Sequence, residues 1–371
     1  MPNLKDRLKR IQESRKDENK KVYSQAEETN VLKNQGWEVC GFKVLKREVT
    51  VPSPFKKIKK LPEALSVIIP DLKGQDLPAI EDFLFFDLET TGLSGGAGTV
   101  AFLAAFGNTV SDSFKIKQYL LLDYPGENDF LENVLGHLKQ EQSVVVSYNG
   151  KCFDSQIIKT RCLMNRINPP LYRHVDLLHP ARRLWKNMIQ DCSQASVETE
   201  ILGLDRSNDI PGFLAPEIWF DFLKTGSTDR LTGICDHNKI DISGLAKMLA
   251  YVISIADNPF NEKNIYDTER LALYWRKNLR KFDDHRINEN LINTGKNLLR
   301  FAAEKKYPQA VYVYAFDQMQ NCNYREAYEY VNYGLDLFET ESIWHEKLLR
   351  RKSRLEKKLN CLHPETLINV N

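Results

Sequence analysis

Cysteine pairs with C-x-x-C spacing are absent from the sequence, and its seven cysteines are scattered and odd in number. This distribution argues against a disulfide framework and against a zinc knuckle, and it favours a reducing compartment. We therefore expect a cytoplasmic protein.

Long apolar runs are also missing. No stretch approaches the roughly 18 apolar residues that a membrane span needs, and residues 1–21 are charged throughout, without the apolar segment of a secretory signal. We expect no membrane partner. The net charge of +2 gives no overall bias toward nucleic acid, so any basic binding surface must be local.

The sequence is long enough for one full domain with smaller additions, since it has 371 residues, of which 42% are hydrophobic and 27% charged. We expect residues 1–80 to hold a charged arm up to about residue 33, a short β-hairpin and a proline-marked linker. An α/β domain should follow over residues 81–258. A helical region should occupy residues 259–371.

The organising stretch is an apolar run, Phe83–Phe86, that leads directly into Asp87 and Glu89. The run predicts a strand buried on both faces, and alternate residues of a strand share a face. Two neighbouring carboxylates at a buried strand end repel each other and lose hydration, for which a divalent metal ion compensates. Taken alone, such a pair is more often a solvated strand end.

Two further acids stand in comparable places. Asn149 and Gly150 form a predicted turn after an apolar strand, which places Asp154 in the first turn of a helix. Helix N-termini favour anions, although a simple helix-start Asp is common. His237 and Asp241 are four residues apart in a strong helical pattern and so share one face. They fit a proton-transfer group beside a metal ligand, or an exposed ion pair.

The order of the predicted elements is three β runs, a helix, a β run and a helix, which indicates an α/β sheet whose antiparallel part comes first. The glycine-rich loop at residues 94–98 lacks the spacing of a phosphate-binding fingerprint. We therefore expect no nicotinamide or flavin cofactor.

Together these segments resemble the DEDD superfamily of 3′–5′ exonucleases on the ribonuclease-H-like fold. The first family motif, D-x-E with T-G following, matches Asp87 to Gly92; the second, N-x-x-x-F/Y-D, matches Asn149 to Asp154. The third matches His237 with Asp241, with the family's tyrosine spacing but a histidine in the tyrosine's place. The sequence resembles most closely the bacterial YprB-like proteins, which join such a domain to a C-terminal TPR region.

The resemblance covers roughly residues 80–255 and implies an α/β fold with a ribonuclease-H-like mixed sheet flanked by helices, followed by an all-α TPR-like region. It also implies two-metal phosphodiester hydrolysis on DNA or RNA, with two Mg²⁺ or Mn²⁺ ions. Asp87 would bridge both ions, Glu89 and Asp241 would hold the nucleophile-side ion, and Asp154 would help to hold the other. His237 would orient or deprotonate the attacking water. The implied nucleotide contacts are the backbone at Leu88 and Thr90, and Asn149. We add Arg182 and Arg183 as phosphate contacts, for which a surface or structural role is an equal alternative.

The C-terminal region has one TPR-like unit over residues 310–338, with flanking helices expected at 285–306 and 341–360. Its basic residues between 347 and 358 could bind nucleic acid or a protein partner, or form a solvated helix face. The main competing hypothesis is an inactive ribonuclease-H-like scaffold that recruits partners through these helices. The intact set of four acids favours a nuclease. Nucleotidyl transfer on the same fold is a third hypothesis, but no additional nucleotide-binding motif supports it.

Overall fold

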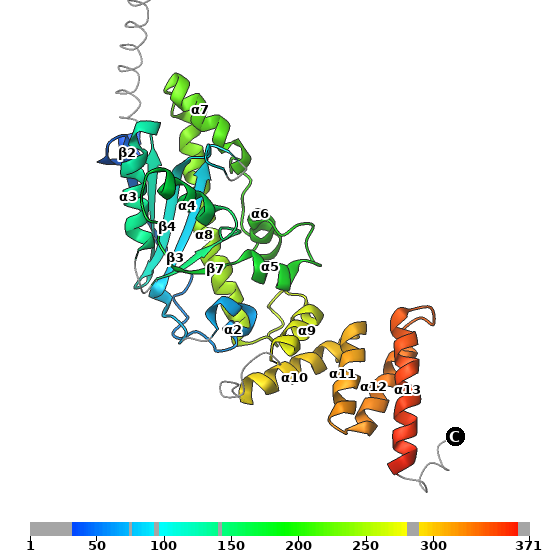
Figure 1. The fold of residues 1–371 in the computed structure, drawn as a ribbon. Helices are drawn as coiled ribbons and strands as arrows, with labels where there is room; N and C mark the ends of the chain where they lie inside the picture. The colour runs from blue at the N-terminus through cyan, green and yellow to red at the C-terminus, as the bar shows by residue number, and fades with distance from the viewer. Residues whose placement is uncertain (1–31, 74–75, 93–95, 140–142, 280–288, 363–371) are drawn as a thin grey trace, which may run out of the picture. The chain divides into compact units, whose positions relative to one another are not determined.

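A computed structural model describes residues 32–73, 76–92, 96–139, 143–279 and 289–362 (Figure 1). The charged arm expected at the N-terminus lies outside these residues as far as residue 31. The chain divides into two compact units. The first falls within Met1–Leu61, Gly74–Pro180 and Asp191–Ile253, and the second within Pro62–Lys73, Ala181–Gln190 and Ser254–Asn371.

The first unit is built on a mixed seven-stranded sheet with the strand order β1-β2-β5-β4-β3-β6-β7. The strands are β1 (Glu38–Gly41), β2 (Val44–Pro52), β3 (Phe83–Thr90), β4 (Ala101–Val110), β5 (Ser113–Leu121), β6 (Val144–Ser147) and β7 (Arg173–Asp176). β3 pairs with β4 antiparallel and with β6 parallel, and β6 pairs with β7 parallel. The expected strand at Phe83 is therefore central, which explains why both of its faces are apolar.

The hairpin expected near residues 37–51 is formed by β1 and β2, and it extends the sheet itself, because β2 pairs with β5 from Val44 to Pro52. Trp37, at its start, is buried, and the guanidinium of Arg47 lies over its ring at 4.9 Å from the centroid. The hairpin is thus one edge of the domain, and its buried face can support residues deeper in the sheet.

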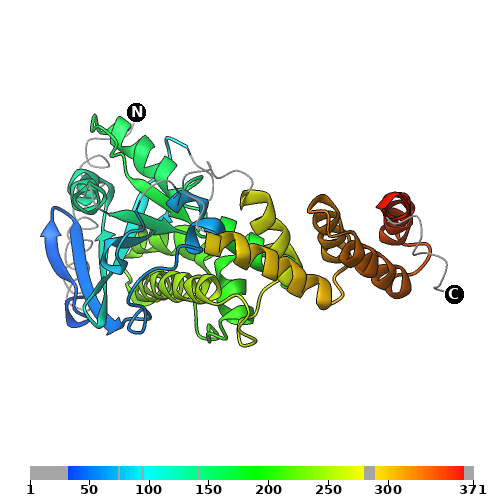
Figure 2. The same ribbon diagram turned by 90° about the horizontal axis from the view of Figure 1, so that it is seen from below.

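Helices cover both faces of the sheet, as the two views of the ribbon show (Figures 1 and 2). The ring of Phe106 stacks on His137 of α3 (Glu127–Leu138) at 4.4 Å between centroids. Its neighbour Gly107 faces the other way, where an added Cβ would lie 2.6 Å from Ile242 of α8 (Asp229–Asp257). Alternate residues of β4 therefore contact helices on opposite faces.

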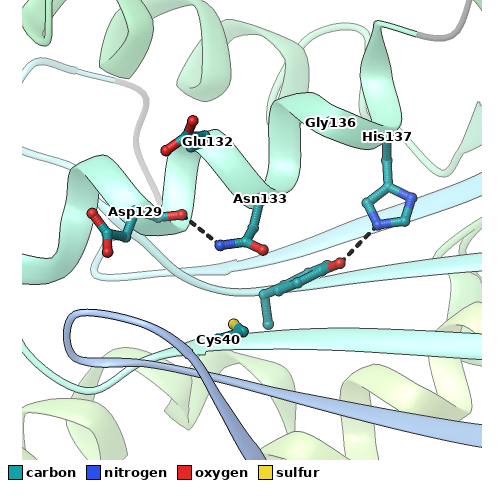
Figure 3. A pocket seen from close by; sticks show the side chains of 7 residues that line it. Cys40, Asp129, Glu132, Asn133, Gly136 and His137 are labelled. Carbon is teal, nitrogen blue, oxygen red and sulfur yellow. Dashed lines mark hydrogen bonds between the residues drawn. The ribbon is translucent and has the colours of Figure 1, made fainter.

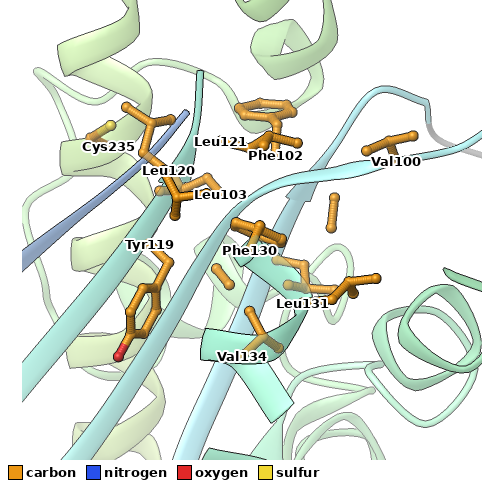
Figure 4. Packing of buried hydrophobic residues seen from close by; sticks show 14 of the residues in the cluster. Val100, Phe102, Leu103, Tyr119, Leu120, Leu121, Phe130, Leu131, Val134 and Cys235 are labelled. Atoms are coloured by element: carbon orange, nitrogen blue, oxygen red, sulfur yellow. The ribbon is translucent and has the colours of Figure 1, made fainter. Parts of the chain in front are cut away.

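The apolar core joins the sheet to α3, to α4 (Asp154–Met164) and to α7 (Ala215–Thr225). Figure 4 shows part of it, with Phe130, Leu131 and Val134 of α3 packed on residues of β4 and β5. The remaining elements of this unit are η2 (Ile80–Asp82), η3 (Tyr124–Gly126), α6 (Gln194–Ser196), the π-helical turn η4 (Val197–Ile201) and η5 (Gly212–Leu214).

The second unit is helical. Its C-terminal helices are α9 (Thr268–Leu279), α10 (Glu289–Glu304), α11 (Pro308–Gln320), α12 (Tyr324–Leu337) and α13 (Ile343–Leu362). The two helices expected over residues 310–338 correspond to α11 and α12. α5 (Leu178–Trp185) ends in this unit. Among the described residues, no helix combines the length and the apolarity that crossing a membrane would need.

The segment expected to be a linker also belongs to the second unit over Pro62–Lys73. It forms α2 (Leu65–Ile68) and η1 (Pro70–Leu72). The prolines suggested a linker, but the apolar side chains between them are fully buried, Leu65, Val67 and Ile68 each at 0% exposure. Burial of these side chains holds the segment in a core, which proline spacing does not reveal.

Candidate metal centre

The carboxyl ends of β3 and β6 bring the predicted acids to one edge of the sheet. Asp87 and Glu89 lie at the end of β3, and Asp154 is the first residue of α4, which follows β6. Because β3 and β6 are parallel, their carboxyl ends meet at the same edge, where ligand sites of such sheets form. The topology therefore explains why acids 65 residues apart in the sequence share one environment.

The turn that carries Asp154 is held by a buried carboxylate that the sequence analysis did not single out. Asp176, at the end of β7, is 1% exposed and accepts hydrogen bonds from the backbone N–H groups of Asn149 (2.8 Å) and Lys151 (3.2 Å). Asn149 adopts a left-handed conformation, with φ of 61°. Gly150 lies so close to Asp154 that an added Cβ would be 2.7 Å from its carboxylate. Asp176 is thus a positioning residue for Asp154.

α8 supplies the histidine and the fourth acid. His237 Nε2 lies 3.3 Å from Asp241 Oδ2 and 3.9 Å from Glu89 Oε1. One ligand atom from each of these three residues lies within 4.8 Å of the others, which is a spacing that a metal ion can bridge. The predicted pair on α8 therefore lies beside Glu89 of the strand end, and it forms an ion pair that is largely buried and not exposed.

A buried hydrogen-bond chain orients Asp87. Asn238, which is fully buried, donates from Nδ2 to Asp87 Oδ2 at 2.7 Å. Its own Oδ1 accepts from Gln118 Nε2 at 3.0 Å, and Gln118 Oε1 accepts from Arg47 Nη2 at 2.7 Å. These hydrogen bonds connect the β1–β2 hairpin through β5 and α8 to the carboxyl end of β3. The hairpin therefore contributes to the geometry of the site.

Arg206 lies at the centre of a second network that the sequence analysis missed. Its guanidinium donates to Asp241 Oδ1 at 2.6 Å, to Glu198 Oε2 at 2.7 Å and to Asp209. Asp209 also contacts His237, with its Oδ1 2.8 Å from Nδ1. Asp209 therefore holds the His237 ring at Nδ1, while Nε2 is the nitrogen near Asp241.

Burial and mutual repulsion raise the pKa values of the clustered acids. Burial, and after it the negative charge of Asp241, raises the pKa of Asp87 to about 7. Burial and then the charge of Asp87 raise the pKa values of Glu89 and Asp154 well above their ordinary range. Burial alone would lower the pKa of His237, but its hydrogen bond to Asp241 and the charges of Asp241 and Glu89 raise that pKa to about 10. The cluster therefore has an excess of negative charge.

The donor set of the cluster fits a divalent metal ion. Glu89 and Asp241 contribute carboxylate oxygens, the ligands that Mg²⁺ and Mn²⁺ prefer, and His237 contributes one imidazole nitrogen. The charges of Asp87 and Asp154 act on Glu89 from beside this group. Four acids, Asp87, Glu89, Asp154 and Asp241, stand beside two cations, Arg206 and His237, so the acids outnumber the cations. A cation bound among these oxygens would supply the missing positive charge.

The predicted substrate residues fall into two groups. Leu88 and Thr90 are buried in β3, and Thr90 Oγ1 donates to the Gly92 carbonyl at 2.8 Å, while Asn149 is exposed beside the acids. Arg182 and Arg183 belong to the second unit.

Arg183 has a structural role in the second unit. Its Nη1 donates to the Ile68 carbonyl at 2.9 Å, and its guanidinium lies over the Tyr274 ring. Arg182 has an exposed side chain. Its role in phosphate binding stays a prediction.

A separate pocket of about 420 Å³ lies between α3 and the strands β1 and β5 (Figure 3). Within it, the Tyr119 hydroxyl and His137 Nε2 are 2.9 Å apart. Burial raises the pKa of Tyr119 to about 12 and lowers the pKa of His137 to about 4, so the pair is neutral at pH 7. None of the clustered acids lines this pocket. It is therefore distinct from the candidate metal centre.

We expect Gly212→Ala to disturb the His237 ring without unfolding the protein. An added Cβ would lie 2.8 Å from His237 Nε2, the far end of a side chain that can rotate away. Because small misplacements of reacting groups reduce rates strongly, the rate of a reaction at the metal centre that uses His237 should fall by about ten- to a hundredfold. The melting temperature should change little. Gly136→Ala, on an exposed helix position with nothing near its Cβ, is the control and should keep full activity.

The fold and the acidic cluster together define a ribonuclease-H-like domain with a candidate metal centre. Residues 84–253 match the family model of the RNase_H superfamily, which confirms the predicted fold. Among curated relatives, the uncharacterized protein YprB of Bacillus subtilis (strain 168) is 38% identical over 174 residues, which confirms the resemblance to YprB-like proteins. The match covers 46% of this chain and 42% of YprB, so the chain spans less than half of that relative. The TPR-like character of the C-terminal helices stays a prediction.

Two solved structures show a weaker overall likeness. The family B DNA polymerase of the archaeon Pyrobaculum calidifontis is 12% identical, with 78% of this chain and 47% of that chain covered and a TM-score of 0.40. The zinc-bound E. coli ExoI–ssDNA complex is 16% identical, with 54% and 45% covered and a TM-score of 0.34.

Proposed function

We propose that the chain is a metal-dependent nuclease, and specifically a 3′–5′ exonuclease that hydrolyses DNA or RNA with two Mg²⁺ or Mn²⁺ ions. The observation that carries the proposal is that four acids lie near one another at one edge of a ribonuclease-H-like sheet. Ligand atoms of Glu89 and Asp241 lie within 4.8 Å of each other, and the charges of Asp87 and Asp154 act on Glu89. The two-ion mechanism and the 3′–5′ polarity rest on the resemblance to the DEDD superfamily.

The four acids would hold the ions, which when bound polarise a phosphoryl oxygen and lower the pKa of water. Asn238 fixes one oxygen of Asp87 at 2.7 Å, so that carboxylate keeps its orientation. Asp209 engages Nδ1 of His237, and Nε2 is therefore the nitrogen that faces Glu89 and Asp241. Because its pKa is raised to about 10, this nitrogen carries a proton near neutral pH and would orient the attacking water by a hydrogen bond.

The proposal is tested with the full chain on single-stranded DNA and RNA, labelled in turn at the 5′ and the 3′ end, with Mg²⁺ or Mn²⁺. We expect the wild type to release mononucleotides or short products from the 3′ end. The Asp241→Asn protein should release them about a hundredfold more slowly or worse, because one metal ligand loses its charge.

Asp221→Asn is the matched control, since Asp221 is an exposed carboxylate on α7 whose partner is Arg230, 3.4 Å away. This variant should keep wild-type activity. The proposal fails if the wild type produces no shortened product from any substrate with either ion. Degradation that starts from the 5′ end would overturn the polarity alone.

A further inference from the structure

α13 has a basic composition that the rest of the chain does not share. Its twenty residues include seven Lys or Arg and two Glu, a net charge of +5, whereas the whole chain carries +2. The remainder of the chain is therefore net acidic. Lys347, Arg351, Arg354 and Lys358 follow each other at spacings of four, three and four residues, which places them on one helical face.

Aromatic rings alternate with these cations. The Lys347 ammonium lies 4.3 Å from the ring centroid of Trp344, and the Lys358 ammonium lies 5.1 Å from that of Tyr324. The guanidinium of Arg351 lies over Tyr312 at 4.4 Å and over Phe316 at 4.5 Å. We call these four cations and four rings the aromatic–basic face.

Arg351 is the buried centre of this face. It is 7% exposed, and its Nη2 donates to the Tyr312 hydroxyl at 2.6 Å. Its Nε has no hydrogen-bond partner, and no carboxylate in the described part of the chain forms an ion pair with it. The positive charge is thus held by ring faces and not neutralised by an acid, and it adds to the positive potential of the more exposed cations on this face.

We propose that the aromatic–basic face binds single-stranded nucleic acid. Such a strand offers phosphates and flat rings in alternation, which match cations interleaved with aromatic side chains. The four cations extend over about 16 Å of helix, the length of about five stacked nucleotides. An acidic peptide would match the charges but would leave the rings without stacking partners. The ligand class rests on the proposed nuclease function, for which this face would be a substrate-binding surface of the second unit.

The experiment measures binding of the full chain to fluorescein-labelled dT20 and rU20 by anisotropy, in EDTA so that no cleavage occurs, over a series of KCl concentrations. We expect the triple variant Lys347→Gln, Arg354→Gln, Lys358→Gln to bind at least about tenfold more weakly. The slope of log affinity against log KCl concentration should become shallower by the contribution of about two phosphate contacts. The control replaces three exposed lysines of the first unit, Lys139, Lys224 and Lys247, by Gln. It has the same net charge and should bind within about twofold of the wild type.

Tryptophan fluorescence supplies a second readout. Trp37, Trp185, Trp219 and Trp275 are fully buried, whereas Trp344 is partly exposed. Stacking of a base on this face should therefore quench the emission of Trp344, and Trp344→Leu should remove the quenching. Equal loss of binding in the triple variant and its control would overturn the proposal, as would unchanged binding in the triple variant. Equal quenching by poly-glutamate would overturn it in favour of an acidic protein partner.

Failure of this inference and failure of the nuclease proposal give different results. A wild type that shortens DNA or RNA, while the triple variant binds unchanged in EDTA, contradicts only the role of α13. A wild type that binds through α13 but never shortens a strand with Mg²⁺ or Mn²⁺ contradicts only the nuclease. Asp241→Asn should bind as the wild type does in EDTA.

Discussion

Asp87→Asn is expected to raise the melting temperature of the protein at pH 8 without divalent ions, while it lowers nuclease activity by about a thousandfold or more. Burial removes water from the Asp87 carboxylate, and Asp241 places a negative charge near it; together these effects raise the pKa of Asp87 to about 7. An asparagine keeps the shape and can still accept the hydrogen bond from Asn238. It has no charge, so it removes the repulsion and the proposed metal ligand together.

The sign of the pH dependence follows from proton binding. The folded protein keeps a proton on Asp87 up to pH values near 7, whereas the unfolded chain loses it near pH 4. The native state therefore binds more protons in this window, and its stability falls as the pH rises from 4 to 7. The full shift corresponds to about 4 kcal/mol as an upper bound. The stabilisation by Asp87→Asn should be largest at pH 8 and should nearly vanish at pH 4.

Thermal melts at pH 4, 6 and 8, with EDTA or with Mn²⁺, measure this effect. Mn²⁺ should stabilise the wild type at pH 8 and have little effect on Asp87→Asn, because an ion that binds only the folded state stabilises it by mass action. Asp221→Asn removes an exposed carboxylate and should change neither the activity nor the response to Mn²⁺. A lower melting temperature for Asp87→Asn at pH 8 in EDTA would contradict the repulsion inferred for the cluster.

The sheet and the four acids could be predicted because each carries a local signal. Phe83–Phe86 form a continuous apolar run, and a central strand between β4 and β6 needs such a run. Asp154 follows a turn signal at Asn149 and Gly150, and Asp241 stands four residues after His237 on an apolar helix. The hairpin was also visible from its alternation, but its pairing with β5 was not, because register between distant strands leaves no trace in a single sequence.

The residues that position the acids differ in how clearly the sequence pattern marks them. Gln118 shares one face of β5 with the buried residues Phe114, Ile116 and Leu120, so a polar residue at this core position was a signal for a buried hydrogen bond. Asn238 likewise interrupts the apolar face of α8 and is fully buried. Arg206 lies in a loop without periodicity, and its partners at 198, 209 and 241 meet only in the folded chain. No sequence pattern marks such a residue.

Arg206→Met should be among the most destabilising substitutions in the first unit. The side chain is 8% exposed and neutralises Glu198, whose side chain is 0% exposed, together with Asp241. Breaking a buried pair leaves a charge without compensation, which costs about 3–5 kcal/mol. In a domain of this size that cost lowers the melting temperature by about 10 °C. Arg206→Lys should rescue little, since one ammonium cannot replace a guanidinium that contacts three carboxylates.

The defect should also depend on pH, because burial raises the pKa of Glu198 to about 7 even beside Arg206. Below that value Glu198 can take up a proton and its charge disappears, so the loss of stability should be smaller at pH 5 than at pH 8. Arg230→Met is the matched control, because Arg230 also contacts two carboxylates, Glu217 and Asp221, but its side chain is 49% exposed. It should cost about 0.5 kcal/mol or less. Equal losses for the two variants would show that the buried network around Asp241 contributes no more than a surface ion pair.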